Sequence, residues 1–248
     1  MSLSPIGYLL WVASGMLLAL IVWALIRRAL VREVPVFSLY VVFQLFRCLG
    51  LAVVYRMGRI EYFYSYWTAQ TISAVLGFAV LYELYRKMFR SYDAIRQLGA
   101  TLFAGAAVML LAAAVLTTAF APGADAAGVV KSVVLLERSV RVMQCGLLLF
   151  LFLLSFHFGL AWRNYLFGIA LGFGIFASVE LMAIALRSQL GGVAAGALAL
   201  ANSAAYDCGL VIWVCYLLAP EPAPQYRGVV QHNDLEKWNQ ALLEILQR

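Results

Sequence analysis

Long apolar runs separated by short polar segments dominate the chain. A helix needs about 20 mainly apolar residues to cross about 30 Å of hydrocarbon at 1.5 Å per residue. Seven runs reach that length, and turn-forming residues such as Pro35, Pro122 and Gly123 fall between them. The pattern predicts an all-α, seven-helix membrane bundle in residues 1–219, with spans at about 6–26, 36–55, 62–84, 98–119, 130–156, 165–186 and 193–218.

Residues 220–248 are polar and follow a proline-rich segment, which predicts a tail outside the bundle. Within it, residues 233–247 are expected to form a short amphipathic helix with Leu235, Trp238, Leu242 and Ile245 on one stripe. Such a helix lies on the membrane surface or docks on the bundle's inner loops or on a separate protein partner. The tail is too short to form an output domain of its own.

The Lys and Arg residues predict the orientation of the chain. The odd connections and the tail hold 11 of them, and the even connections, together with Lys131 at the boundary of the fifth span, hold 4. The N-terminus is therefore expected outside and the C-terminus in the cytoplasm, with the bacterial inner membrane as the expected location. The first run is interpreted as a retained span rather than a signal peptide, because it lacks a basic start and is followed by Arg27 and Arg28.

Composition narrows the class of protein. Hydrophobic residues make up 65% of the chain and charged residues 12%, whereas soluble domains carry about 25% charged residues. This excludes a soluble enzyme and a disordered chain. The net charge of +6 does not indicate nucleic-acid binding, because the basic residues lie between apolar runs.

Polar residues inside the spans are the candidate site. An ionisable group in hydrocarbon costs at least about 2.5–3.5 kcal/mol, so it normally faces protein or water. Counting along the spans places several such groups in the outer half of the bundle. The predicted ligand-binding residues are Arg47, Gln70, Glu137, Arg141, Gln144, Glu180 and Asp207.

Two interpretations of these residues remain open. In one, they form buried ion pairs that fix the order of the helices and bind nothing. In the other, which we prefer, they line a hydrated pocket open to the outside. Its arginines would suit a small polar or anionic ligand, since a guanidinium offers two parallel donors to a carboxylate.

No catalytic or cofactor pattern is found. The two histidines, His157 and His232, do not supply a set of metal ligands, and the last span has no lysine for a retinal Schiff base. Phosphate-binding, dinucleotide-binding and Ser-His motifs are also missing. We expect no enzyme activity, no cofactor and no metal.

Glycines predict one close helix contact. Gly168, Gly172 and Gly174 give the sixth span a small-residue surface, interpreted as intramolecular packing rather than dimerisation. The segment 194–197, which begins the seventh span, is compatible with being its partner.

Taken together, the sequence favours a receptor-like or sensory membrane module whose pocket charges repack when a ligand binds. One alternative is a small secondary transporter with Asp207 or Glu180 as its coupling carboxylate. Another is a non-catalytic subunit of a larger membrane complex.

Overall fold

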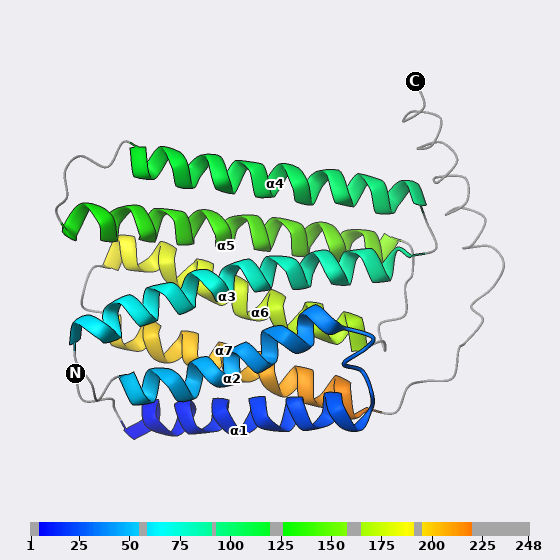
Figure 1. Cartoon of the computed structure of the whole chain (residues 1–248), viewed down its shortest axis with the longest axis horizontal. Helices are drawn as coiled ribbons and strands as arrows, with labels where there is room; N and C mark the ends of the chain where they lie inside the picture. Colours follow the sequence, from blue (N-terminus) through cyan, green and yellow to red (C-terminus); the bar gives the residue numbers. More distant parts are fainter. Residues whose placement is uncertain are drawn as a thin grey trace. The chain divides into compact units, whose positions relative to one another are not determined.

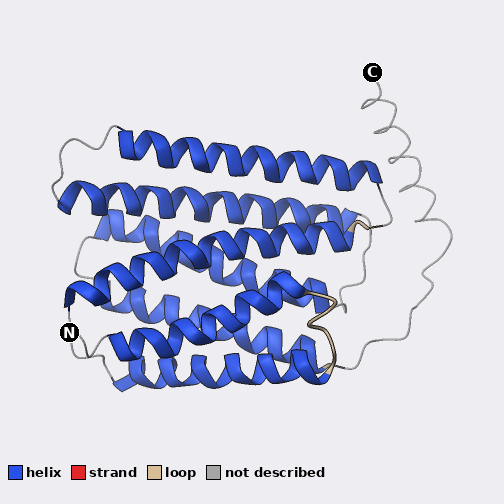
Figure 2. Ribbon diagram, in the orientation of Figure 1, coloured by secondary structure: helices blue, strands red, loops and turns tan. Residues whose placement is uncertain are grey.

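The structure is a computed structural model that describes residues 5–54, 59–90, 93–119, 126–157, 165–190 and 195–219. Seven helices lie in these residues, and the rest of them form loops (Figures 1 and 2). The helices are α1 (Pro5–Arg27), α2 (Pro35–Val54), α3 (Arg59–Met88), α4 (Asp93–Ala119), α5 (Ala126–His157), α6 (Tyr165–Leu190) and α7 (Ala195–Leu218). The prediction of an all-α fold is confirmed for the described residues, whereas the number of membrane spans and their orientation stay predictions. The tail, with its expected helix at 233–247, lies outside the described residues.

Four helices are long and apolar enough to cross a membrane over their described residues, which indicates a multi-pass membrane protein. These stretches are Pro5–Arg27, Ser139–Phe156, Tyr165–Leu186 and Gly196–Leu218. A shorter apolar stretch, Pro35–Leu51, lies in α2.

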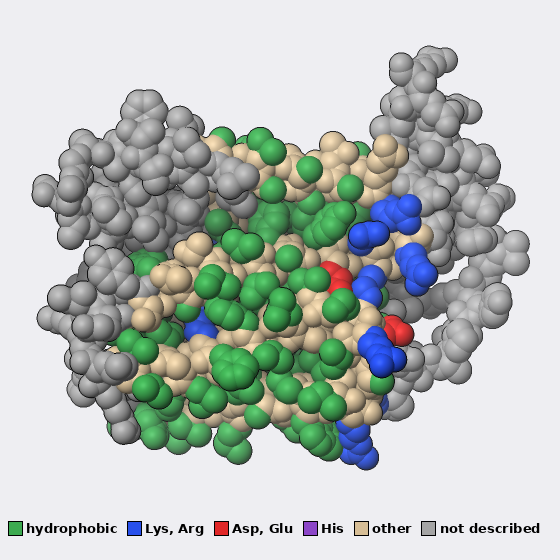
Figure 3. Space-filling model, viewed as in Figure 1, with side chains coloured by type: hydrophobic (Ala, Val, Ile, Leu, Met, Phe, Trp, Pro, Cys, Tyr) green, Lys and Arg blue, Asp and Glu red, His purple; other side chains and the backbone are tan. Residues whose placement is uncertain are grey.

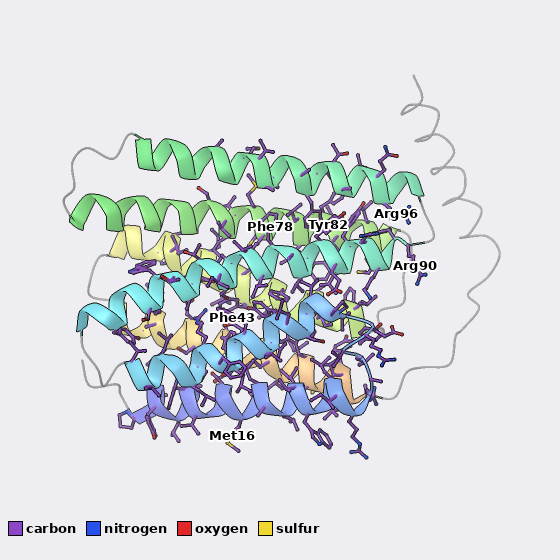
Figure 4. The ribbon with its side chains drawn as sticks, viewed as in Figure 1. Met16, Phe43, Phe78, Tyr82, Arg90 and Arg96 are labelled. Atoms are coloured by element: carbon purple, nitrogen blue, oxygen red, sulfur yellow. The ribbon has the colours of Figure 1, made fainter. Side chains whose placement is uncertain are left out.

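The surface of α1 agrees with a lipid environment. Large apolar side chains repeat every three or four residues on its exposed face, and Met16 is 69% exposed and points away from the neighbouring helix (Figure 4). Hydrophobic side chains cover much of the visible surface of α1 and α2 (Figure 3). Arg27 at the end of α1, and Arg28 and Arg32 just after it, are exposed. A stripe of this length would be costly in water and is typical of a lipid-facing helix.

The chain divides into two compact units, each with its own packing. The first unit comprises Met1–Glu83 and Trp162–Pro222, and so holds α1, α2, most of α3, α6 and α7. The second begins at Leu84 and, among the described residues, holds the end of α3 with α4 and α5.

In the first unit, α7 packs against both α1 and α6, and α1 also packs against α2 (Figure 1). α1 and α7 run in the same direction, because Ser14 bonds Asp207 and Arg28 bonds the carbonyl of Ala219 further along both helices. α6 and α7 run in opposite directions. The buried core of this unit includes Leu18, Ile21, Leu25, Phe37, Val41, Ile169, Leu210, Trp213 and Leu217.

The glycines of α6 allow a close approach to α7, as expected for intramolecular packing. A Cβ atom on Gly168 would overlap the ring of Tyr216, and one on Gly172 would overlap Trp213 and lie 2.9 Å from the carbonyl oxygen of Gly209. The expected partner segment, 194–197, is wrong for these two glycines. The helices are antiparallel, so the first turns of α6 lie beside the last turns of α7.

An aromatic cluster fills the space next to this contact. Trp213 lies 4.9 Å from Phe173, 5.1 Å from Phe37 and 6.2 Å from Tyr40, measured between ring centroids. The indole Nε1 of Trp213 donates a 3.0 Å hydrogen bond to the carbonyl of Ile169, which satisfies a buried polar group.

The connection from α1 to α2 begins with a Schellman motif. The N–H of Leu30 bonds the carbonyl of Leu25, and the N–H of Ala29 bonds the carbonyl of Ile26. Ala29 has a φ of 54°, a left-handed conformation that glycine adopts more easily. Leu25 and Leu30, at the two positions where this motif commonly has apolar side chains, are both buried.

Side chains from distant positions cap two helix ends near this connection. Arg28 donates from Nη1 to the carbonyl of Ala219 at 2.7 Å and from Nη2 to that of Leu218 at 2.8 Å, at the end of α7. Glu83 of α3 accepts from the N–H groups of Val36 and Phe37, in the first turn of α2. The ends of α2 and α7 are thereby tied to other helices.

In the second unit, α4 packs against α5, and Tyr85 at the end of α3 packs closely on α4. A Cβ atom on Gly99 would overlap the Tyr85 ring, which is also 5.8 Å from Phe103 and 6.2 Å from Phe150 between centroids.

Candidate functional site

Polar side chains of three helices in the first unit meet at one place. We call this the polar cluster, and it consists of Ser14 on α1, Arg47 and Cys48 on α2, and Tyr206 and Asp207 on α7. Ser14 Oγ lies 2.5 Å from Asp207 Oδ1, which joins α1 to α7. A Cβ on Gly15 would lie 3.7 Å from Cys48 Sγ, so the thiol lies directly against α1.

Electrostatic interactions connect the members of the cluster. Arg47, Cys48 and Asp207 all act on the phenol of Tyr206, and Arg47 and Asp207 also act on the thiol of Cys48. Asp207 is only 8% exposed, and its Oδ2 accepts no hydrogen bond from the described residues. The cluster therefore holds a buried carboxyl that is only partly satisfied.

The cluster lies at a similar level in each helix. Ser14 is nine residues from Pro5, Arg47 is seven from Val54, and Asp207 is twelve from Ala195. At 1.5 Å per residue these positions are about 10–18 Å from the helix ends on the side of the chain's N-terminus. The predicted depth of Arg47 and Asp207 below the outer membrane surface stays a prediction.

A second polar contact joins α2 to α3. Gln44 Nε2 donates to the hydroxyl of Tyr40 at 2.7 Å and to Ser73 Oγ at 2.9 Å, and Gln44 is buried. The predicted site residue Gln70 precedes Ser73 by one helical turn on α3 and is partly buried. Tyr40 also interacts electrostatically with Tyr206, so the Gln44 contact and the polar cluster are adjacent.

A small cavity lies beside Tyr206, between α2, α6 and α7. Its volume is about 10 Å³, close to the minimum space for one water molecule. It is lined by Tyr40, Gly172, Phe173, Phe176, Tyr206, Gly209, Leu210 and Trp213. A ligand larger than water would have to displace side chains to bind there.

Glu180 lies further toward the end of α6 and the start of α7. Phe176 packs on Tyr206 with 5.3 Å between ring centroids, and the antiparallel direction then places Glu180 near the level of Asn202. Glu180 is 8% exposed, and Asn202 Oδ1 is buried with no hydrogen bond from the described residues. The contact between α6 and α7 is thus polar about one helical turn from Asp207, toward the start of α7.

The remaining predicted site residues belong to the second unit. Arg141 and Gln144 are both buried on α5, and Arg141 Nη1 donates to Gln144 Oε1 at 2.9 Å. The side chain of Glu137 lies outside the described residues. That all seven predicted residues line one pocket stays a prediction.

Sequence reasoning missed three members of the polar cluster, namely Ser14, Cys48 and Tyr206. Ser14 is the sole Ser or Thr of α1, and it lies in an otherwise apolar helix. A single hydroxyl in the middle of an apolar span commonly forms a hydrogen bond to another helix. The position of Ser14 could therefore have indicated a contact between helices.

Within the described residues, no group of His, Cys, Asp and Glu side chains is arranged to hold a metal ion. Comparisons with protein-family models, with curated proteins and with solved structures find no match to this chain.

Proposed function

We propose that the chain is a receptor-like or sensory seven-span module of the bacterial inner membrane, with its N-terminus outside. A small polar or anionic ligand enters from the outer side and changes the charge pairing in the polar cluster. The observation that carries this proposal is Asp207, which is buried, bonded to Ser14 through one oxygen and unsatisfied at the other. A buried carboxyl with one oxygen that accepts no hydrogen bond can form a hydrogen bond or ion pair with more than one partner.

The exposed basic residues support the proposed threading. Arg27, Arg28 and Arg32 are exposed where α1 ends, and Arg86 and Arg90 are exposed where α3 ends. Both positions are odd connections, which the positive-inside rule assigns to the cytoplasm. The guanidinium of Arg27 also lies 5.0 Å from the ring of Trp23, an arrangement typical of a membrane boundary.

Arg47 supports an anionic ligand. It is the basic residue of the polar cluster, and it is partly buried on α2. A guanidinium recognises a carboxylate or phosphate through two parallel hydrogen bonds. Because the adjacent cavity holds about one water, binding would require the side chains around Tyr206 to move, and this movement is the proposed response.

Amide hydrogen exchange at the α1–α2 connection tests the proposal. The N–H groups of Leu30, Glu33 and Val34 are hydrogen-bonded there, so their exchange reports opening of the connection. The protein is reconstituted in vesicles, and exchange is measured with and without succinate as a dianionic probe. We expect succinate to change the exchange rate of these amides.

The matched control compares two arginines. Arg47→Gln removes the guanidinium of the polar cluster and is expected to abolish the effect of succinate, whereas Arg32→Gln removes an exposed guanidinium and is expected to leave it. The proposed sensing site is wrong if succinate alters amide exchange equally in both variants. It is also wrong if succinate has no effect on amide exchange in the unmodified protein.

Asp207 also favours a second candidate, a secondary transporter coupled to protons. Buried carboxyls inside membrane helices commonly act as coupling sites. The test of transport uses vesicles that contain radiolabelled succinate. A flux of succinate across the membrane that is driven by a pH gradient and is lost in Asp207→Asn would identify transport. A change in amide hydrogen exchange at the α1–α2 connection without any succinate flux would identify sensing.

A further inference from the structure

The hydroxyl of Ser14 has two oxygen neighbours but only one hydrogen to donate. Ser14 Oγ lies 3.0 Å from the carbonyl oxygen of Leu10 and 2.5 Å from Asp207 Oδ1. A hydroxyl carries a single hydrogen, and both a carbonyl oxygen and an ionised carboxylate are acceptors without a hydrogen of their own. If both contacts are hydrogen bonds, the second hydrogen belongs to the carboxyl group of Asp207.

The other oxygen of Asp207 leads to the same conclusion. Oδ2 is buried and receives no hydrogen bond from the described residues. An ionised carboxylate in that position would leave much of its charge uncompensated, at a cost of several kcal/mol in a low-dielectric site. A neutral carboxyl that donates to Ser14 avoids this cost.

The groups around Asp207 differ from helix to helix. α1 contributes the Ser14 hydroxyl, and its described ionisable residues, Tyr8 and Arg27, lie near its two ends. α6 contributes Glu180, about one turn nearer the outer end. α7 contributes Tyr206 and α2 contributes Cys48, and both interact electrostatically with Asp207. α2 also contributes Tyr40 and Arg47, which interact with Tyr206. The single cation among the described groups of this neighbourhood is Arg47.

We infer that Asp207 is a proton-binding site that switches the contact between α1 and α7. In the protonated form, Asp207 donates to Ser14 Oγ and Ser14 donates to the carbonyl of Leu10. When the proton leaves to water, the Ser14 hydrogen turns to the carboxylate, and the new negative charge attracts Arg47 on α2. This inference deepens the proposed function and rests on it for its biological role: the proton is the regulator of the same site.

The release of the proton is balanced within this site. One O–H bond of the carboxyl breaks, a water molecule accepts the proton, and the carboxylate retains the electron pair. The bond from Ser14 to Leu10 is exchanged for one from Ser14 to Asp207, so the serine hydrogen is used in both states. The net change between the two states is one negative charge on the Asp207 carboxylate. Arg47 is the positively charged group that compensates this charge.

Infrared spectroscopy of the full chain in lipid vesicles tests the inference. A protonated carboxylic acid has a C=O stretching band that a carboxylate lacks. At neutral pH we expect such a band in the unmodified protein, and we expect it to fade as the pH rises. Asp207→Asn should remove this band, whereas Glu180→Gln, which removes another buried carboxyl of the same unit, should retain it.

Isotope labelling keeps the test independent of whether Asp207→Asn folds. Aspartate labelled with ¹³C in its carboxyl group shifts the band of an aspartic acid and leaves that of a glutamic acid in place. Ser14→Ala should then move the labelled band, because the acid loses its hydrogen-bond acceptor. If no aspartic-acid band exists at neutral pH, or if Ser14→Ala leaves it unmoved, the inference is wrong.

This readout is separate from the test of the proposed function. The infrared band requires no ligand and no response at the α1–α2 connection. An aspartic-acid band without any effect of succinate would refute the sensing proposal and retain the proton site. An effect of succinate without such a band would retain sensing and refute the proton site.

Discussion

Replacing Glu83 tests how the start of α2 is stabilised. The first turn of a helix has N–H groups without partners inside the helix. In α2, Pro35 has no N–H, and the N–H of Ser38 bonds a carbonyl four residues earlier. The N–H groups of Val36 and Phe37 remain, and both donate to the buried carboxylate of Glu83, at 3.4 and 3.0 Å respectively. Glu83→Ala leaves both donors without this acceptor.

The expected loss follows from these two bonds. A hydrogen bond to a charged group contributes about 1.5–3 kcal/mol, and the bond at 3.4 Å contributes less than the one at 3.0 Å. A negative charge at a helix N-terminus adds about 0.3–1 kcal/mol. Glu83→Ala should therefore lower the free energy of unfolding by about 2–4 kcal/mol. Glu83→Gln, which retains one oxygen acceptor, should lose about half of that.

Reversible unfolding in mixed micelles, followed by circular dichroism, measures these losses. Glu33→Gln is the matched control, since Glu33 is an exposed glutamate that accepts a bond from the hydroxyl of Tyr165. Its loss should stay below about 1 kcal/mol because the pair is exposed. The reasoning fails if Glu83→Ala unfolds at the same detergent fraction as Glu33→Gln.

Three further predictions concern the backbone and the packing of the helices, and the same unfolding assay measures all of them. Ala29→Gly should raise stability by about 0.5–1 kcal/mol, since glycine relieves the left-handed φ of 54°, and a loss of stability would contradict this. Gly172→Ala should lower the free energy of unfolding by about 1–3 kcal/mol, because the added methyl group overlaps buried Trp213. Gly146→Ala on α5 is the control: its methyl group meets nothing within 4 Å, so the change should be neutral or stabilising. Equal effects of these two alanines would refute the close contact of α6 and α7. Trp213→Phe should cost about 1–2 kcal/mol through the lost bond to Ile169 and the lost volume, and it should raise the amide exchange of α6.

The positions of the helices were accessible from the sequence because each apolar run is as long as a membrane span. The bounds were less accurate where polar residues extend a helix. α3 continues to Met88, four residues beyond the predicted end at 84, because Arg86 and Lys87 favour helix and lie outside the apolar run. Hydrophobicity indicates where a chain is buried in lipid, and it does not indicate where backbone hydrogen bonding stops.

The pairing of side chains between helices was not accessible in the same way. Asp207 was predicted as a site residue because a carboxyl is costly in hydrocarbon, but its partner Ser14 costs little anywhere and was overlooked. Which residue faces Asp207 depends on the order and the rotation of the helices, and one sequence does not specify either. The direction of α7 was deducible, however. If α6 and α7 are antiparallel neighbours, the start of α6 lies beside the end of α7, and the observed contact of Gly168 with Tyr216 agrees with this direction.

The α1–α7 contact is fixed at two levels, which limits how a change at Asp207 can reach the end of α7. Ser14 holds Asp207 near the middle of the two helices, and Arg28 holds the carbonyls of Leu218 and Ala219 at their C-terminal ends. Because Arg28 binds backbone oxygens through two nitrogens, sliding α7 along α1 would break both bonds at once. A change in pairing at Asp207 is therefore expected to rotate or bend α7 about its C-terminal end, rather than to shift it lengthwise. Rotation moves Trp213 against Gly172, where there is no room for a methyl group, and so it must also displace α6.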